Sequence, residues 1–267
     1  MSLSYRRGVH LEEPKSDPDI ARAAALIADG SRARILKALC DGRSITATVL
    51  AEEAGVSGPT ASVHLAKLVE AGLVTAHRDG RNRRYRLARA EVAEALEALA
   101  LIAPPLRVSS LKQSVRADAL RRSRTCYDHL AGRLGVHLMG VLLETKVLSG
   151  VDGTHRPATA VHDRPAAYGR DHHYEVTDEG ATTLRLLGID VLESTRRRPL
   201  VRYCVDWSEE RHHLSGALGA AIASRLFTLG WVRHGAIPRV VHLTDVGADG
   251  LTRTFGRSFE LVATEAP

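Results

Sequence analysis

Two helices joined by a tight turn are predicted over residues 46–71, and this motif constrains the fold most strongly. The first helix, over 46–56, ends near Gly55, which can adopt the left-handed conformation that closes a helix. Ser57 suits the N-cap of the second helix, and Pro59 lies in its first turn, where no intrahelical hydrogen bond is lost. The buried face of the second helix is predicted to consist of Ala61, Leu65, Leu68 and Val69.

The second helix, over 58–71, leaves a polar face along its N-terminal half. The side chains expected to face solvent are Thr60, Ser62, His64 and Lys67. A helix pair whose second helix exposes polar groups near its N-terminus has the geometry that enters the major groove of DNA. We therefore predict DNA contacts from these four residues and from Ser57 at the turn.

Residues 73–88 alternate in the manner of two short strands and predict a β-hairpin that turns at Asp79 and Gly80. Arginine is concentrated around this turn, as Arg78, Arg81, Arg83, Arg84, Arg86 and Arg89. Guanidinium groups that neutralise phosphates release condensed counterions, and this adds sequence-independent affinity for DNA. The hairpin is therefore predicted to be a basic wing, with Tyr85 in its core and with DNA contacts from Arg78, Arg81, Arg83 and Arg84.

The run VLAEEAGVSGPTASVHLAKLVEAGLVTAHRDGRNRRYRLA resembles the ArsR/SmtB family of winged-helix bacterial repressors. The resemblance covers about residues 17–102. It implies a homodimer that binds double-stranded operator DNA and is released by an inducer. It also implies that the helices over 17–28 and 89–102 form the dimer interface. An architectural DNA-binding dimer without a ligand is the alternative interpretation.

The helix predicted over 89–103 must stop at Pro104 and Pro105, because a residue that precedes proline avoids the helical conformation. We place a domain boundary at these prolines. The resulting division is a flexible tail over 1–16, a winged helix-turn-helix domain for DNA binding and dimerisation over 17–103, a helical connector over 104–125 and a C-terminal sensor domain over 126–267.

The C-terminal domain is predicted to contain a tandem pseudo-repeat. The sequence HLAGRLG at 129–135 matches HLSGALG at 213–219, and VTDEG at 176–180 matches LTDVG at 243–247. Each copy, over about 126–190 and 204–257, is expected to be a helix–hairpin–helix unit, with hairpins around 168–176 and 231–243. The predicted fold class is therefore mainly α with small β-hairpins (α+β).

The metal-binding positions familiar from the resembling family are missing here. The helix over 46–56 holds neither Cys nor His, and the helix over 89–102 holds no His. We therefore expect any signal to be sensed in the C-terminal domain. The candidate ligands for Zn²⁺ or another transition metal there are Cys126, Asp128, His129, Cys204, Asp206, His212 and His213.

Other interpretations of this cluster remain open. Cys126 and Cys204 could be redox-active thiols, or buried core thiols with Asp128 and Asp206 as helix caps. A pocket for a small molecule between the two copies is the third possibility. The insert over 150–165 is expected to be a flexible loop without a binding motif, and the pair at 172–173 to be exposed histidines without a function.

Composition and missing motifs exclude several protein classes. Three cysteines in 267 residues do not form a disulfide framework, and the first eighteen residues have no apolar core typical of a secretory signal. The apolar stretch over 214–232 contains Arg225 and three glycines, which favours a packed helix over a membrane span. We expect a cytoplasmic protein without a membrane partner. An enzyme fused to a DNA-binding domain is disfavoured, because GxGxxG, GxSxG and GxxxxGK[ST] are absent after Pro105.

Overall fold

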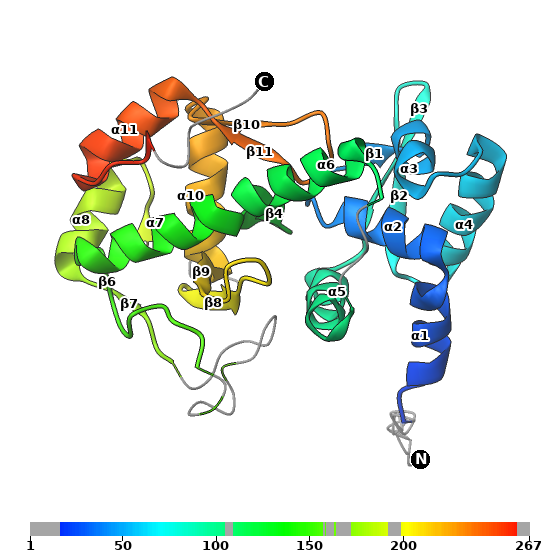
Figure 1. Ribbon diagram of the computed structural model, residues 1–267, viewed down its shortest axis with the longest axis horizontal. Helices are drawn as coiled ribbons and strands as arrows, with labels where there is room; N and C mark the ends of the chain where they lie inside the picture. Colours follow the sequence, from blue (N-terminus) through cyan, green and yellow to red (C-terminus); the bar gives the residue numbers. More distant parts are fainter. Residues whose placement is uncertain are drawn as a thin grey trace, which may run out of the picture.

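The computed structural model describes residues 17–104, 109–156, 158, 163, 172–191 and 199–260, so the tail expected over 1–16 lies outside the described residues. Figure 1 shows two groups of elements side by side, with helix α6 (Leu111–Arg122) between them. Each group has its own hydrophobic core, the first centred on residues such as Leu36, Leu50 and Leu65 and the second on residues such as Leu134, Leu218 and Leu251.

The N-terminal group is a winged helix-turn-helix domain. Its elements are α1 (Ile20–Ala28), α2 (Gly30–Leu39), β1 (Ile45–Thr46), α3 (Ala47–Ala54), α4 (Gly58–Glu70), β2 (Val74–Asp79), β3 (Asn82–Leu87) and α5 (Ala90–Ile102). The three strands form an antiparallel sheet in the order β1-β3-β2. Gly55 adopts the left-handed conformation after α3 and the Ser57 hydroxyl caps α4, as the sequence predicts.

The C-terminal group consists of short antiparallel strand pairs and helices. Its elements are β4 (Arg124–Cys126), β5 (His129–Ala131), α7 (Gly132–Glu144), β6 (Leu148–Ser149), β7 (Glu175–Val176), α8 (Asp178–Leu186), β8 (Arg202–Val205), β9 (His212–Ser215), α10 (Gly216–Thr228), β10 (Val232–His234), β11 (Val241–Leu243) and α11 (Asp245–Phe255). The pairs are β4-β5, β6-β7, β8-β9 and β10-β11. The chain is therefore mainly helical with small antiparallel strand pairs, as expected.

The order strand pair, helix, strand pair, helix occurs twice in this group, and α7 and α10 are both 13 residues long. The expectation that each unit starts with a helix was wrong, because His129 and His213 lie on strands that pair with β4 and β8. The first hairpin was also misplaced, since β7 pairs with β6 at Leu148 and Ser149. Residues 164–171 lie outside the described part of the chain.

Two glycines allow the β4-β5 and β8-β9 hairpins to approach each other. A Cβ atom on Gly135 of α7 would lie 2.4 Å from the carbonyl oxygen of Leu130 and 3.5 Å from Cβ of His213. A Cβ atom on Gly219 of α10 would lie 2.8 Å from the carbonyl oxygen of Leu214 and 3.3 Å from Cβ of His129. Each helix therefore passes close to its own hairpin and to the histidine of the other hairpin.

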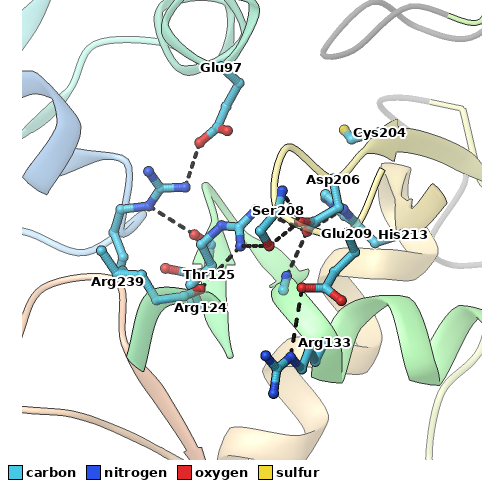
Figure 2. A network of polar contacts seen from close by, with 12 residues as sticks. Glu97, Arg124, Thr125, Arg133, Cys204, Asp206, Ser208, Glu209, His213 and Arg239 are labelled. Carbon is cyan, nitrogen blue, oxygen red and sulfur yellow. Dashed lines mark hydrogen bonds and ion pairs between the residues drawn. The ribbon is translucent and has the colours of Figure 1, made fainter. Parts of the chain in front are cut away.

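A buried ion pair connects the two halves of the C-terminal group (Figure 2). The carboxylate of Asp206 accepts hydrogen bonds from Arg124 Nη2 at 2.9 Å and from the backbone N–H of Gly132 at 2.7 Å. Ser208 donates to the other carboxylate oxygen through its N–H and its hydroxyl. The side chains of Arg124 and Asp206 are 1% and 0% exposed, so water cannot solvate either charge if its partner is lost.

Among the described residues, no helix is both long and apolar enough to cross a membrane.

The Asp206→Asn variant is expected to lose about 3–5 kcal/mol of unfolding free energy, because it leaves the buried Arg124 guanidinium without its counter-charge. Urea denaturation measures this loss. The matched control is Glu144→Gln, which removes the partner of Arg257 from an exposed ion pair and should cost less than about 1 kcal/mol. An equal effect of the two substitutions would contradict the structural role of the buried pair.

The stability that Asp206 supplies should depend on pH. Burial acts to raise the pKa of Asp206, but His213 and Arg124 outweigh it and hold the pKa below its ordinary value. The unfolded chain takes up a proton at the ordinary carboxyl pKa of about 4. The contribution is therefore complete above about pH 4 and decreases as the pH falls below that value. The difference between the wild-type chain and Asp206→Asn should shrink in the same range.

Candidate nucleic-acid interface and metal centre

The turn before α4 and the solvent-facing side of α4 present polar groups to solvent. Ser57, Thr60, Ser62 and Lys67 are exposed. The Ser57 hydroxyl lies 2.8 Å from that of Thr60, and the Ser62 hydroxyl donates to the carbonyl oxygen of Gly58 at 3.0 Å. These hydroxyl groups therefore form an ordered polar surface at the N-terminus of the helix, where the aligned backbone dipoles favour an anion such as phosphate.

His64 does not share this exposed face, contrary to the sequence-based expectation. Its side chain is 15% exposed, and Nδ1 lies 3.9 Å from the carboxylate of Asp29, the residue that caps α2. His64 follows Thr60 by one helical turn, but its imidazole lies against the start of α2 and is only partly exposed. His64 therefore contributes to the packing of α4 on the domain.

The β2-β3 hairpin carries the arginines of the predicted wing. Arg78, Arg81 and Arg83 are exposed, while Tyr85 is buried in the wing core as expected. Arg84 has internal partners: Nε donates to the Asp79 carboxylate at 2.6 Å and Nη1 to the carbonyl oxygen of Ser44 at 3.1 Å. Arg84 therefore fixes the wing to the segment before β1, and the other three guanidinium groups stay available to an external anion.

Four of the seven predicted ligands converge in the C-terminal group. The ligand atoms of Cys126, His129, Cys204 and His213 all lie within 4.8 Å of one another, and three of the four residues are buried. Cys126 is paired directly across its hairpin with His129, and Cys204 is paired in the same way with His213. Each hairpin therefore supplies one thiol and one imidazole. We call these four residues the Cys/His cluster.

The two predicted carboxylates lie behind the imidazoles of the Cys/His cluster. Asp128 Oδ1 lies 3.2 Å from Nδ1 of His129, and Asp206 Oδ2 lies 3.2 Å from Nδ1 of His213. A carboxylate that holds one ring nitrogen fixes the orientation of the ring and leaves the other nitrogen free to bind a metal. Asp128 and Asp206 therefore lie beside the outer ring nitrogens and outside the group of four converging ligand atoms.

The geometry of the cluster fits a tetrahedral metal ion. Zinc bonds of about 2.0–2.1 Å to nitrogen and about 2.3 Å to sulfur give a nitrogen–sulfur edge of roughly 3.6 Å. His129 Nε2 lies 3.7 Å from Cys204 Sγ. The hydrogen bond with Cys204 and burial raise the pKa of Cys126 to about 12, so its thiol is protonated at neutral pH and coordination of an ion would displace the proton.

His212, the remaining predicted ligand, faces the other side of β9. Its Nε2 lies 2.8 Å from Asp163, which also contacts His155 at 3.0 Å. The insert over 150–165 therefore contributes His155 and Asp163 to a cluster with His212 that the sequence analysis did not name. The concentration of His and Asp over 152–173 was the available signal.

The β4-β5 hairpin touches the N-terminal domain directly beside the Cys/His cluster. The N–H of Tyr127 donates to the carbonyl oxygen of Cys40 at 3.0 Å, and the Thr125 hydroxyl donates to Asp41 at 3.0 Å. Gly42 has a positive φ of 72°, and a Cβ atom there would lie 2.2 Å from the carbonyl oxygen of Tyr127. The residues before and after Cys126 are thus both fixed to the end of α2.

A second contact runs from the β10-β11 loop to α5 (Figure 2). The buried Arg239 forms an ion pair with Glu97 of α5 and donates through Nε to the carbonyl oxygen of Thr125 at 3.1 Å. Burial alone would raise the pKa of Glu97, but Arg239 and Arg124 outweigh it and lower the pKa below its ordinary value. The same loop therefore contacts both α5 and the strand that carries Cys126.

Comparison with known proteins places both groups of elements in one family. A family model described as a helix-turn-helix domain matches residues 27–77. The probable mercury resistance operon repressor of Streptomyces lividans is 39% identical over 84 residues, which is 31% of this chain and 66% of that protein. The transcriptional regulator KmtR of Mycobacterium tuberculosis is 44% identical over 62 residues, 23% of this chain and 47% of that protein.

A longer relative extends into the C-terminal group. The uncharacterised helix-turn-helix transcriptional regulator YdfF of Bacillus subtilis strain 168 is 39% identical over 232 residues, 86% of this chain and 94% of that protein. A match of this length cannot be confined to the N-terminal domain. The chain belongs to the helix-turn-helix transcriptional regulators of ArsR/SmtB type.

Proposed function

We propose that this regulator is a dimeric repressor whose affinity for operator DNA changes when the Cys/His cluster binds a thiophilic divalent metal ion. The observation that carries the proposal is the convergence of two thiols and two imidazoles from separate hairpins within 4.8 Å. Such a mixed sulfur and nitrogen donor set suits zinc and related borderline ions. When bound, the ion would act as a cross-link between the two hairpins.

Recognition of DNA is proposed to combine α4 with the wing. The exposed residues Ser57, Thr60, Ser62 and Lys67 would lie in the major groove, and Arg78, Arg81 and Arg83 would contact phosphates. His64, which is only partly exposed, and Arg84, which has internal partners, are left out of the proposed contacts.

Exposed apolar side chains support the proposed homodimer. Every residue of α1 except Arg22 is apolar, yet none is buried, and Ile20 is 76% exposed. On α5, Leu99 and Ile102 are 42% and 81% exposed. Apolar side chains on two helices of one domain form a surface that a partner copy would remove from water. The two helices are those that the family resemblance assigns to the dimer interface.

The contacts beside the cluster provide a physical route from the signal to the DNA-binding domain. Cys126 is preceded by Thr125, which is hydrogen-bonded to Asp41, and followed by Tyr127, which is hydrogen-bonded to Cys40. Any shift of the Cys126 backbone must therefore change the contact with the end of α2, or move α2 with it. A signal changes DNA affinity only if it binds the two arrangements with different affinity.

The Arg83→Ala variant should bind all DNA duplexes more weakly, because Arg83 is proposed to neutralise a phosphate. The slope of log K against log salt should become shallower by about one for each arginine withdrawn from DNA. Fluorescence anisotropy of a labelled duplex at several salt concentrations measures both effects. Arg253→Ala is the matched control, since it removes an equal charge from an exposed site on α11. An unchanged salt slope in Arg83→Ala would refute the wing assignment.

The double variant Cys126→Ser/Cys204→Ser should bind operator DNA normally but no longer respond to Zn²⁺. It should also lack the near-ultraviolet charge-transfer absorption that cobalt–thiolate bonds give when Co²⁺ is added to the wild-type protein. Cys40→Ala is the control, since Cys40 is a buried thiol outside the cluster. A normal zinc response in the double variant would exclude the cluster from sensing. A wild-type protein that binds DNA equally with and without Zn²⁺ would favour the architectural alternative.

A further inference from the structure

A buried carboxylate with several imidazole neighbours lies on the opposite side of β9 from the Cys/His cluster. Asp163 is 1% exposed, and its Oδ1 lies 2.8 Å from Nε2 of His212. Its Oδ2 lies 3.0 Å from Nδ1 of His155 and accepts a hydrogen bond from the N–H of Arg156 at 2.9 Å. The ligand atoms of His155, Asp163 and His212 lie within 4.8 Å of one another.

A third imidazole, from His172, faces the same carboxylate. Its Nε2 is buried and 3.7 Å from Asp163 Oδ2, beyond hydrogen-bond distance, and no hydrogen-bond partner for this nitrogen occurs among the described residues. Buried ring nitrogens are normally paired, so an unpaired nitrogen directed at a carboxylate indicates a missing ligand. A purely structural role of Asp163, as an acceptor for His155, His212 and Arg156, does not account for His172.

We propose that His155, Asp163 and His212, completed by His172, form a second divalent metal site, with only nitrogen and oxygen donors. The three ligand atoms lie within 4.8 Å of one another, and the hydrogen-bonded separations of 2.8 and 3.0 Å would open to the roughly 3.4 Å edges of a tetrahedral shell with bonds of about 2.0–2.2 Å. Imidazole with one carboxylate suits Zn²⁺, Co²⁺ or Ni²⁺. This site contains no thiol, so its chemistry differs from that of the Cys/His cluster.

The imidazole of His212 is held in place by two tyrosines, as the imidazole of a metal-binding histidine usually is by its neighbours. The hydroxyl of Tyr174 lies 2.6 Å from Nδ1 of His212, and the Tyr203 ring is stacked on the imidazole at a centroid distance of 4.1 Å. These contacts fix the ring and engage the nitrogen that faces away from Asp163. Coordination of an ion through Nε2 would place the ring proton on Nδ1, which would then donate it to the Tyr174 hydroxyl.

The site would attach the segment between β6 and β7 to β9. The N–H of His212 donates to the carbonyl oxygen of Gly153 at 2.8 Å, and Thr154 forms a β-bridge with Arg211. The backbone therefore already places His155 beside β9. An ion shared by His155, Asp163, His172 and His212 would add a link at the far end of this segment.

Metal stoichiometry of the full-length protein tests the proposal. Protein stripped with a chelator and reloaded with Zn²⁺ should hold two ions per chain. His155→Gln/His172→Gln should hold one ion and should keep the cobalt–thiolate absorption when loaded with Co²⁺. Cys126→Ser/Cys204→Ser should also hold one ion, but its Co²⁺ spectrum should lack that absorption. His173→Gln is the control, because His173 is exposed and adjacent to His172.

The two double variants test the second metal site and the Cys/His cluster independently of each other. His155 and His172 have side chains that are 15% and 17% exposed, and circular dichroism checks that their replacement leaves the fold intact. A folded His155→Gln/His172→Gln protein with undiminished zinc content, or a Cys126→Ser/Cys204→Ser protein with none, would overturn the second site. A wild-type protein that holds one ion without the thiolate absorption, together with a His155→Gln/His172→Gln protein that holds none, would support the second site and contradict the sensor.

Discussion

The close approach of the β4-β5 and β8-β9 hairpins is the constraint on which the C-terminal group depends. It requires Gly135 and Gly219, because a side chain at either position would collide with backbone of its own hairpin. The approach brings the thiols and imidazoles of both hairpins together, and it places Asp206 of one half against Arg124 of the other. The same packing thus supplies a ligand set and a buried charge pair that stabilises it.

The position of the Cys/His cluster connects it to DNA binding. The last two residues of the short strand β4 contact different parts of the protein. Thr125 is hydrogen-bonded to Asp41 of the N-terminal domain, and Cys126 belongs to the Cys/His cluster. Regulatory changes in proteins generally act through small shifts of packed elements between discrete arrangements. A cluster on the hairpin that contacts α2, next to a loop that holds α5 through Arg239, can act on both the DNA-binding helices and the proposed dimer interface.

Local patterns predicted the N-terminal domain well, and long-range contacts explain where prediction failed. The turn at Gly55 and the arginine-rich hairpin are signals within a few residues, and both were confirmed. His64 is less exposed than its helical position predicts, and its ring lies near Asp29, which is far away in sequence. The strand at His129 was predicted to be part of a helix. It is only three residues long, which is too short to show an alternating pattern, and its pairing with Cys126 is not visible in the sequence. The burial of Asp163 includes a contact with His212 of β9, which is distant in sequence.

Thermodynamic linkage gives the most direct test of the central claim, that metal at the Cys/His cluster controls DNA affinity. If the ion weakens operator binding by some factor, then operator DNA must weaken ion binding by the same factor. The affinity of the His155→Gln/His172→Gln protein for Zn²⁺ should be measured by competition with a chelator, in the absence and presence of an operator selected from random duplexes. The account predicts weaker zinc binding by the DNA-bound protein. Equal zinc affinities in the two states would contradict it.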